Sequence, residues 1–214
     1  MIDYRALVTG IGKMAKTATE QIVGKLRKKA VLRSRDLSAG SGVYRTHLQR
    51  LEQQGVIERA GRGLYRLAGV ELTEYESYLA AAQLVPQGVI CLLSALRFHD
   101  LTTQNPFEIW MAIENKSHPP KSETAPLRIH YFSGAAFTEG VEEHKISGVT
   151  VRVYSVAKTV ADCFKFRNKI GLDVALEALR ECRRERRATA DEIWRYAEVC
   201  RVKNVMRPYL EAVW

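Results

Sequence analysis

The stretch from Gly42 to Leu67 constrains the fold more than any other part of this chain. It begins with a helix-forming segment that runs to Gln54 and stops at Gly55, a residue type that commonly caps the C-terminus of a helix. Two short β-rich runs, 56–60 and 64–67, follow at once and enclose the loop Gly61-Arg62-Gly63. A three-residue loop with glycine between such runs predicts a β-hairpin. A helix that leads directly into a hairpin is typical of a winged helix-turn-helix.

Two helices, the second of them short, are expected before this unit. The capping-box pattern Thr17-Ala-Thr-Glu20 predicts the start of the first helix. The apolar stripe of that helix consists of Ile22, Val23, Leu26 and Ala30. The second helix is expected over 33–39, with Leu37 inward, and the run Ala39-Gly40-Ser41-Gly42 is expected to form the turn into the third.

The third helix, from about Gly42 to Gln54, has two different faces when its residues are placed at 100° intervals. The predicted inward face holds Val43, Tyr44, His47, Leu48 and Leu51. The predicted outward face holds Gly42, Arg45, Thr46, Gln49 and Gln53, with Arg50 and Glu52 at its edges. Arginine can pair with the N7 and O6 atoms of guanine, and glutamine with N6 and N7 of adenine, in a major groove.

The positive charge of the chain is confined to the same region. Residues 1–68 hold 14 basic and 5 acidic side chains, whereas residues 69–214 hold 19 of each, so the whole net charge of +9 lies in the first third. Such a surplus suits a polyanion. The candidate DNA-binding residues are Ser41, Gly42, Arg45, Thr46, Gln49, Arg50, Arg59, Arg62 and Arg66, the last three placed along a phosphate backbone. The alternative is a small helical domain with a solvated basic face.

The remaining residues predict an α+β fold, with a small antiparallel sheet and packed helices. Strand-like runs occur at 107–113 and 127–132, and a hairpin is expected over 145–154 around Ser147-Gly148. Helices are expected from Thr73 to Leu84, from Val89 to His99, after Ser155, around 172–179 and after Thr189. The predicted domains are therefore 1–70, a winged helix-turn-helix, and 71–214, an α+β domain.

A cytoplasmic protein without membrane contact is expected. Ser77 to Leu96 has no charged residue over 20 positions, but Pro86-Gln87-Gly88 interrupts it, so two buried helices joined by a turn are predicted. The first residues show no apolar signal core. The four cysteines are far apart in sequence and suggest reduced core residues, not a zinc or redox motif.

The chain presents no recognisable active site, and neither a metal nor a cofactor is predicted. Ser155-Val-Ala-Lys158 matches the SxxK pattern of serine acyl enzymes, but the partner motifs are absent, and a helix-capping serine followed by a surface lysine is expected instead. His99-Asp100 is interpreted as polar residues at a helix end. No glycine-rich phosphate loop and no pair of histidines at helical spacing occurs.

Two charged segments in the second half remain open to two interpretations. The first is a row predicted to be exposed on 158–173, which consists of Lys158, Asp162, Lys165, Arg167, Asn168, Lys169 and Asp173. It is either solvated or a face that meets a toxin or another macromolecule. The second, Arg183 to Arg187, is either a solvated helix end or an auxiliary contact for DNA or a partner.

Two segments resemble a known family. The hairpin Gly61-Arg-Gly-Leu-Tyr-Arg-Leu67 is followed by Ser94-Ala-Leu-Arg-Phe-His-Asp-Leu-Thr102 and by the long motif from Val153 to Leu179. Together they resemble the AbiEi family of bacterial abortive-infection antitoxins over about residues 15–205. The resemblance implies the antitoxin half of a type IV toxin–antitoxin pair, whose toxin is a nucleotidyltransferase. It also implies repression of the shared operon by binding of double-stranded DNA at inverted repeats, and it leaves a direct complex with the toxin open.

Three functional hypotheses follow. The first is a non-enzymatic autorepressor and antitoxin. The second is a stand-alone winged-helix regulator whose α+β domain senses a small ligand. The third is an enzyme such as a DNA-targeted nuclease, against which the absence of a carboxylate or histidine cluster argues.

Overall fold

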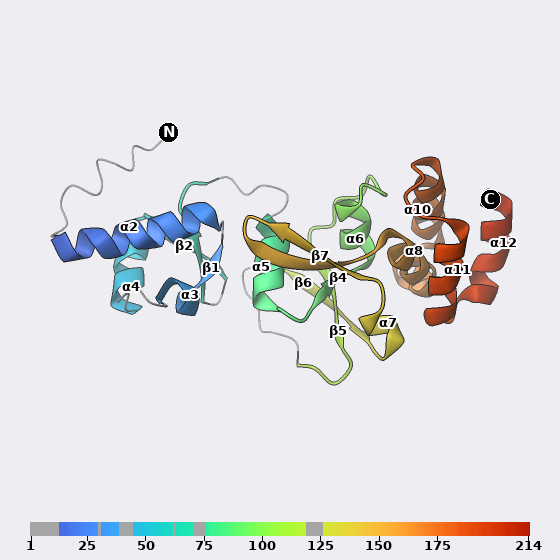
Figure 1. Cartoon of the computed structure of the whole chain (residues 1–214), viewed down its shortest axis with the longest axis horizontal. Coiled ribbons are helices and arrows are strands. Elements are labelled where there is room, and N and C mark those ends of the chain that lie inside the picture. Colours follow the sequence, from blue (N-terminus) through green and yellow to red (C-terminus); the bar gives the residue numbers. More distant parts are fainter. Residues whose placement is uncertain (1–12, 30, 39–44, 62, 71–75, 119–125) are drawn as a thin grey trace.

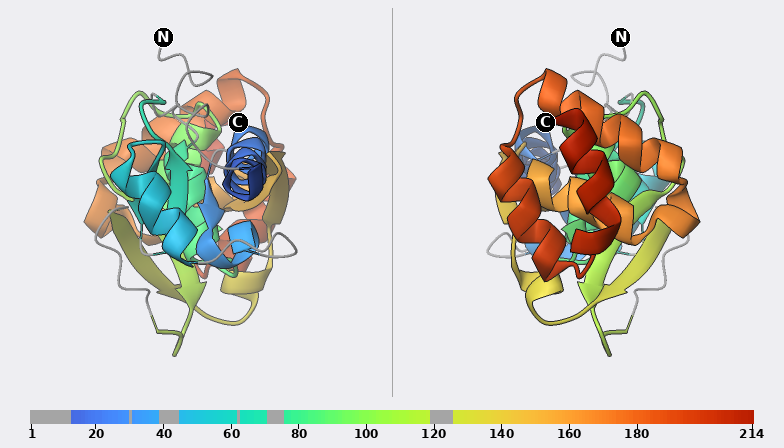
Figure 2. Two further views of the ribbon diagram at one scale, coloured as in Figure 1. Left: turned by 90° about the vertical axis from the view of Figure 1, so that its left-hand side faces the viewer. Right: turned by 90° about the vertical axis from the view of Figure 1, so that its right-hand side faces the viewer.

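The computed structural model describes residues 13–29, 31–38, 45–61, 63–70, 76–118 and 126–214. Its elements lie in a row along the long axis of the molecule (Figure 1). A winged helix (residues 13–68) occupies one end, a β-sheet lies in the middle, and a group of helices closes the other end. The two end-on views in Figure 2 show the winged helix and the C-terminal helices at opposite ends. We refer to residues 76–214 as the α+β region.

The winged helix contains three helices and a small sheet. Its elements are α2 (Lys13–Lys28), β1 (Leu32–Arg33), α3 (Ser34–Ser38), α4 (Arg45–Gln53), β2 (Ile57–Gly61) and β3 (Leu64–Leu67). The sheet has the strand order β1-β3-β2, and both pairings are antiparallel. The helix–hairpin order predicted from the sequence is thereby confirmed.

Apolar side chains at helical spacing hold this unit together. Ile22 and Leu26 of α2 are buried against Leu37 of α3 and against Leu48 and Leu51 of α4. The core is completed by residues of the hairpin, namely Val56, Ile57 and Tyr65. Because each helix contributes one apolar side, its opposite side stays available for other contacts.

In the winged helix, the start of α2 differs from the sequence prediction, whereas the end of α4 agrees with it. Helix α2 begins at Lys13, so Thr17 lies inside the helix and the predicted start is wrong. Gly55 ends α4 as predicted, with φ of +66°. The amide of Val56 donates to the carbonyl oxygen of Leu51 over 2.9 Å, which completes the turn after the helix. The predicted turn at 39–42, and Val43 and Tyr44, lie outside the described residues.

The α+β region is built on a five-stranded sheet with the order β6-β5-β4-β8-β7. The strands are β4 (Val89–Ile90), β5 (Ile109–Glu114), β6 (Leu127–Phe132), β7 (Val141–Ile146) and β8 (Val149–Tyr154). The helices are α5 (Glu76–Leu84), α6 (Leu92–Phe98), α7 (Ala135–Thr138), α8 (Val156–Lys165), α9 (Arg167–Ile170), α10 (Leu172–Arg184), α11 (Ala190–Val199) and α12 (Lys203–Val213).

The predicted α+β class is confirmed, and the sheet adds parallel pairs to the antiparallel ones. β4 pairs antiparallel with β5, and β7 with β8, whereas β4–β8 and β5–β6 are parallel. The hairpin turn lies at Ser147 and Gly148, as predicted, and both residues have positive φ. No sequence pattern predicted the short elements β4, α7 and α9, or helix α12.

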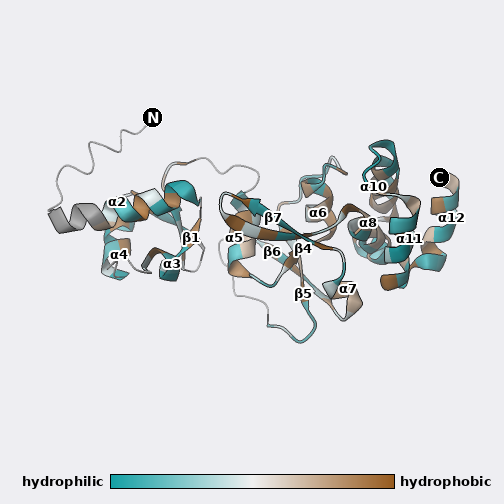
Figure 3. Cartoon of the chain, in the orientation of Figure 1, coloured by the Kyte–Doolittle hydropathy of each residue, from teal (hydrophilic) through white to brown (hydrophobic). Residues whose placement is uncertain are grey.

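Successive strand residues enter two different cores. Met111 and Ile113 of β5 pack with Tyr78 and Leu79 of α5, whereas Trp110 and Ala112 pack in the core that contains α8 and α10 to α12. This alternation follows from the two-residue period of a strand. Figure 3 shows α5 as largely hydrophobic and the strands as a mixture of hydrophobic and hydrophilic residues, while α10 and α11 are largely hydrophilic.

The uncharged segment 77–96 forms two buried helices, α5 and α6, with the turn at Pro86-Gln87-Gly88 and the strand β4 between them. Gly88 is required there because a Cβ atom would lie 2.4 Å from the sulfur of Met111. In the part of the chain that the structure describes, no helix is long and apolar enough to cross a membrane.

Candidate nucleic-acid interface and partner face

Helix α4 presents a polar face that points away from the core. Arg45, Thr46, Gln49 and Arg50 are exposed, because the opposite side of the helix is anchored by Leu48 and Leu51 at 1% and 3% exposure. Figure 1 shows α4 at the end of the molecule remote from the C-terminal helices. The predicted residues Ser41 and Gly42, just before the helix, lie outside the described residues.

The hairpin places its arginines in different environments. Arg59 of β2 is 52% exposed, and its Nε atom lies 3.0 Å from a carboxylate oxygen of Glu52 at the end of α4. Its guanidinium also lies over the ring of Tyr65. Arg59 therefore remains beside the polar face of α4. Arg62, predicted at the tip of the hairpin, lies outside the described residues.

Arg66 is less exposed than Arg59. Its side chain is 21% exposed and forms an ion pair with Glu58, its cross-strand partner, at 2.5 Å. Arg66 lines two cavities of about 160 and 170 Å³, and Glu76 of α5 lines both as well. The structure thus places Arg66 at the junction with α5, and its phosphate contact stays a prediction. In a strand, neighbouring side chains point to opposite faces, so Arg66 turns toward α5 while Tyr65 turns toward the winged-helix core.

Of the charged row predicted to be exposed on 158–173, one part is buried in the structure and the other part is exposed. Lys158 and Asp162 are fully buried, at 0% exposure, so the part of the prediction that placed them on the surface is wrong. The physical reason is the position of α8, which contacts α6, α10 and α11 and packs on the sheet in the same core. A helix covered on every side buries even polar positions, and here the two opposite charges neutralise each other.

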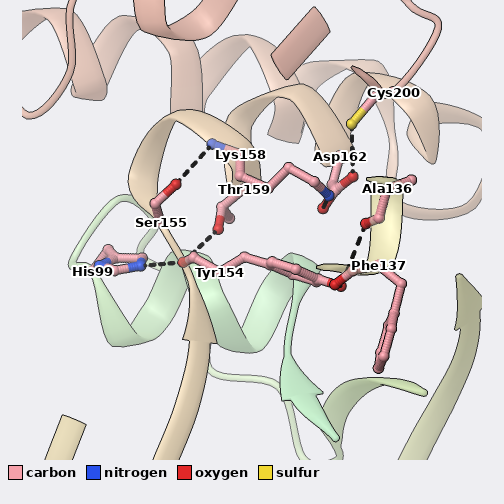
Figure 4. Close-up of polar contacts among 9 residues, drawn as sticks. All are labelled: His99, Ala136, Phe137, Tyr154, Ser155, Lys158, Thr159, Asp162 and Cys200. Atoms are coloured by element: carbon pink, nitrogen blue, oxygen red, sulfur yellow. Dashed lines mark hydrogen bonds and ion pairs between the residues drawn. The ribbon is translucent and has the colours of Figure 1, made fainter. Parts of the chain in front are cut away.

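A compact polar cluster surrounds this ion pair (Figure 4). The Nζ atom of Lys158 lies 2.6 Å from Oδ2 of Asp162, and the thiol of Cys200 donates to Oδ1 over 3.1 Å. The ammonium group also lies 4.2 Å from the ring centroid of Tyr154. Burial raises the pKa of Asp162, an effect that the nearby charge of Lys158 opposes. Burial likewise raises the pKa of Cys200 to about 12, so its thiol stays protonated as a hydrogen-bond donor.

Neither short motif assembles catalytic groups. The hydroxyl of Ser155 accepts a hydrogen bond from the backbone amide of Lys158 and caps α8, as predicted. The predicted surface position of Lys158 is wrong, because its ammonium group points into the core toward Asp162. His99 is 5% exposed, and its Nε2 lies 2.7 Å from the carbonyl oxygen of Tyr154. Burial lowers the pKa of this imidazole.

The exposed remainder of the row forms a cationic surface with a residue that the sequence analysis missed. Lys165, Asn168, Lys169 and Asp173 are exposed, whereas Arg167 is half-buried and donates to the carbonyl oxygen of Phe164. Arg128 of β6 joins this surface through a series of aromatic contacts: it lies over Trp110, which stacks on His130, and His130 meets the ring of Phe166, over which Lys169 lies. Its guanidinium also lies 3.7 Å from a carboxylate oxygen of Glu108. We call Arg128, Lys165 and Lys169 the cationic face.

Aromatic rings underlie the cationic face. The ring of His130 stacks on Trp110 and meets the edge of Phe166. Arg128 lies over Trp110 at 4.6 Å, and Lys169 lies over Phe166 at 5.6 Å. Burial lowers the pKa of His130 to about 4, and the nearby charges of Lys169 and Arg128 add to this effect. These cation–π contacts hold the charged groups of Arg128 and Lys169 over the rings at exposed positions. The only sequence signal for Arg128 was the alternation of side chains along β6, which places Arg128 and His130 on the same face of the strand.

The second basic segment is partly neutralised. Arg184 at the end of α10 forms ion pairs with Glu181 and Glu185, at 2.5 and 3.0 Å. The guanidinium of Arg183 lies over the ring of Trp214. These contacts favour the interpretation as a solvated helix end.

Comparison with known proteins supports the winged-helix assignment. Residues 25–68 match a family model described as transcriptional regulator, AbiEi antitoxin. This match confirms the resemblance to the AbiEi family for residues 25–68, which hold β1, α3, α4 and the hairpin. A search of curated proteins finds no significant match.

The fold of the chain also occurs in a solved structure. The crystal structure of the RV2827C protein from Mycobacterium tuberculosis superposes with a TM-score of 0.60 over 85% of this chain and 71% of that one. The sequence identity is 13%, so the similarity concerns the fold.

Proposed function

We propose that this chain is a DNA-binding repressor and the antitoxin of a toxin–antitoxin pair. The proposal starts from residues 25–68 of its winged helix, which match the model of the AbiEi antitoxin regulators. The exposed polar face of α4 is the observation that supports DNA binding best. Four side chains able to bind bases or phosphates occupy one side of a helix whose other side is fixed in a core. A rigid support of this kind suits recognition in the major groove.

The proposed roles within the winged helix differ between residues. Arg45 and Gln49 read base edges, because arginine and glutamine offer bidentate pairing to guanine and adenine. Thr46, Arg50 and Arg59 bind the sugar-phosphate backbone and set the register, as phosphate contacts do in other complexes. Ser41, Gly42 and Arg62 complete the proposed surface. Two chains on the two halves of an inverted repeat then block transcription of the operon.

Selection of preferred sites from random duplex DNA tests base reading. The wild-type chain and the Arg45→Ala, Gln49→Ala and Arg128→Ala variants are compared at one salt concentration. Loss of either α4 residue is expected to cost roughly 1–3 kcal/mol in affinity and to relax the selected motif. Arg128→Ala removes the same charge from the α+β region and serves as the control. An unchanged motif with Arg45→Ala and Gln49→Ala refutes this role.

The antitoxin role is proposed for the α+β region, with the cationic face as its contact surface. Arg128, Lys165 and Lys169 offer an exposed positive surface that suits an acidic protein or a nucleic acid. The resemblance implies that the toxin is a nucleotidyltransferase. We propose that the cationic face meets the toxin or a macromolecule on which it acts, and that Arg167, Asn168 and Asp173 border this contact.

Co-expression with the neighbouring gene tests this role through growth. Lys165→Glu combined with Lys169→Glu is expected to abolish protection and to leave operator repression intact. Lys145→Glu, at an exposed position of β7, is the matched control. Full protection by the double variant contradicts the proposed contact surface. Lack of toxicity of the neighbouring gene contradicts the toxin–antitoxin proposal itself.

A further inference from the structure

A polar cleft of about 520 Å³ lies between the winged helix and the α+β region. Its walls come from the end of α2, from β1 and the start of α3 on one side, and from α5, the turn at 86–87 and the β7–β8 hairpin on the other. Ligand sites for small molecules commonly have volumes of about 300–1,000 Å³ and occur where two structural units meet.

Cations from both sides converge on this cleft. Lys29, Arg33 and Arg35 come from the winged helix, and Arg152 comes from β8. Two acidic residues, Asp36 and Glu143, line the same cleft. Asp36 lies 3.8 Å from the adjacent Arg35, and Glu143 stands opposite Arg152 in the β7–β8 pairing.

Four cations and two carboxylates leave the cleft with an excess of positive charge. Neither Lys29 nor Arg33 forms an ion pair with any residue that the structure describes. Burial and the neighbouring Arg35 lower the pKa of Arg33 despite the opposing effect of Asp36, which reflects a net cost of keeping this guanidinium charged in the cleft. A bound anion removes this cost, because it supplies the missing opposite charge.

Several contacts hold the cleft in shape. The side-chain amide of Gln83 donates to the carbonyl oxygen of Val31 and joins α5 to the strand end of the winged helix. Arg152 donates through Nη1 to the carbonyl oxygen of Gln87 over 2.9 Å. The stem of Lys29 lies across the hairpin turn, where a Cβ on Gly148 would come within 3.2 Å of its Cε. Preorganised donors bind an anion at a smaller entropic cost.

The geometry points to a binding site for a phosphorylated small molecule of nucleotide size in this cleft. Arginine is suited to bidentate binding of phosphate. A phosphate group alone leaves most of the volume unfilled, and Leu32, Ala82 and Val149 offer apolar surface for an organic body. Gln83, Gln87 and Thr150 add polar groups for its hydroxyls or ring atoms. A ligand there contacts both the winged helix and the α+β region.

Isothermal titration of the full chain tests the site. The probes are inorganic pyrophosphate, AMP, ADP, ATP and GTP, each added to the wild type and to Arg33→Ala with Arg152→Ala. Saturable binding of at least one nucleotide at one site per chain is expected. The double variant is expected to raise its Kd at least about tenfold, because it removes two guanidinium groups that form charge-assisted hydrogen bonds to phosphate.

Two controls keep the result interpretable. Arg207→Ala removes an exposed cation from α12, at the opposite end of the molecule from the winged helix, and is expected to leave the Kd unchanged. Thr150→Glu places a negative charge in the cleft at an exposed position and is expected to weaken binding even if the double variant folds poorly. The inference is overturned if no probe binds, or if binding persists in both cleft variants.

DNA phosphate is the competing source of the anion, and a separate arm distinguishes it. The salt dependence of binding to a DNA duplex is measured for the wild type and for the same double variant. If no nucleotide binds and the slope of log K against log salt falls by about 1 for each lost cation, the cleft binds DNA phosphates and the small-ligand site is refuted. The ligand site does not depend on the antitoxin role, since the titration requires neither operator nor toxin.

Discussion

Lys158 and Asp162 form an ion pair of 2.6 Å inside the α+β region, and neither side chain has any exposed surface. They lie one helical turn apart on α8, which packs on the sheet and contacts α6, α10 and α11. A buried pair of this kind is expensive to break, because a single remaining charge has neither water nor a partner.

Removal of one partner of this pair is therefore expected to destabilise the fold strongly. Lys158→Met leaves the Asp162 carboxylate buried without its cation, at a cost of about 3–5 kcal/mol. The double variant Lys158→Met with Asp162→Leu is expected to recover most of this loss. Urea unfolding of the wild type, both single variants and the double variant measures the coupling. A loss of less than about 1 kcal/mol in Lys158→Met contradicts the burial of a charged pair.

Gly140 is expected to tolerate no side chain. Its φ is +73°, and a Cβ atom would lie 2.8 Å from the Cβ of Lys158. Gly140→Ala is therefore expected to lower the free energy of unfolding by more than about 1 kcal/mol. Gly24→Ala is the matched control, because a Cβ there meets nothing within 4 Å inside helix α2, and it is expected to stabilise by roughly 0.5–1 kcal/mol. Equal effects of the two substitutions would refute the steric explanation.

His130 is expected to make stability depend on pH between about 4 and 6.5. Burial lowers its pKa to about 4 in the folded chain, whereas the unfolded chain binds the proton near 6.5. The stabilisation is therefore complete above pH 6.5 and is lost as the pH falls to about 4, with a total near 3 kcal/mol. His130→Phe keeps a ring in the stack but does not titrate. The difference in unfolding free energy between the two proteins is expected to change over this range, and a constant difference counts against the prediction.

Arg66 is expected to contribute to stability and not to sequence-specific DNA binding. It is half-buried between the hairpin and α5 and pairs with Glu58. Arg66→Ala is expected to cost about 1–2 kcal/mol of stability through lost packing. Arg50→Ala, at an exposed position of α4, is the contrasting variant and is expected to reduce the salt slope of DNA binding by about 1. A selective loss of DNA affinity in Arg66→Ala, without a change in thermal midpoint, would instead support the phosphate contact predicted for this residue.

Local patterns sufficed for much of the fold. The helix–hairpin order of the winged helix, the Gly55 helix end, strand β6 and the Ser147-Gly148 turn all depend on neighbours within a few residues. The polar side of α4 was predicted for the same reason, because helical periodicity requires only that one side be apolar. The capping box at Thr189 is likewise formed as predicted.

Tertiary packing decided the rest. Periodicity places Lys158, Asp162 and Lys165 on one side of a helix, but only the position of α8 against the sheet and the other helices determines that two of them are buried and one is exposed. In the same way, the pairing of β2 with β3 and the contact with α5 turn Arg66 away from solvent. The residue type alone gives the charge of a side chain, whereas its burial depends on which distant elements pack around it. The sequence by itself therefore determined a winged helix whose third helix has a polar face, and the tertiary structure alone decided which charged residues of the α+β region reach the surface and that four cations line one cleft.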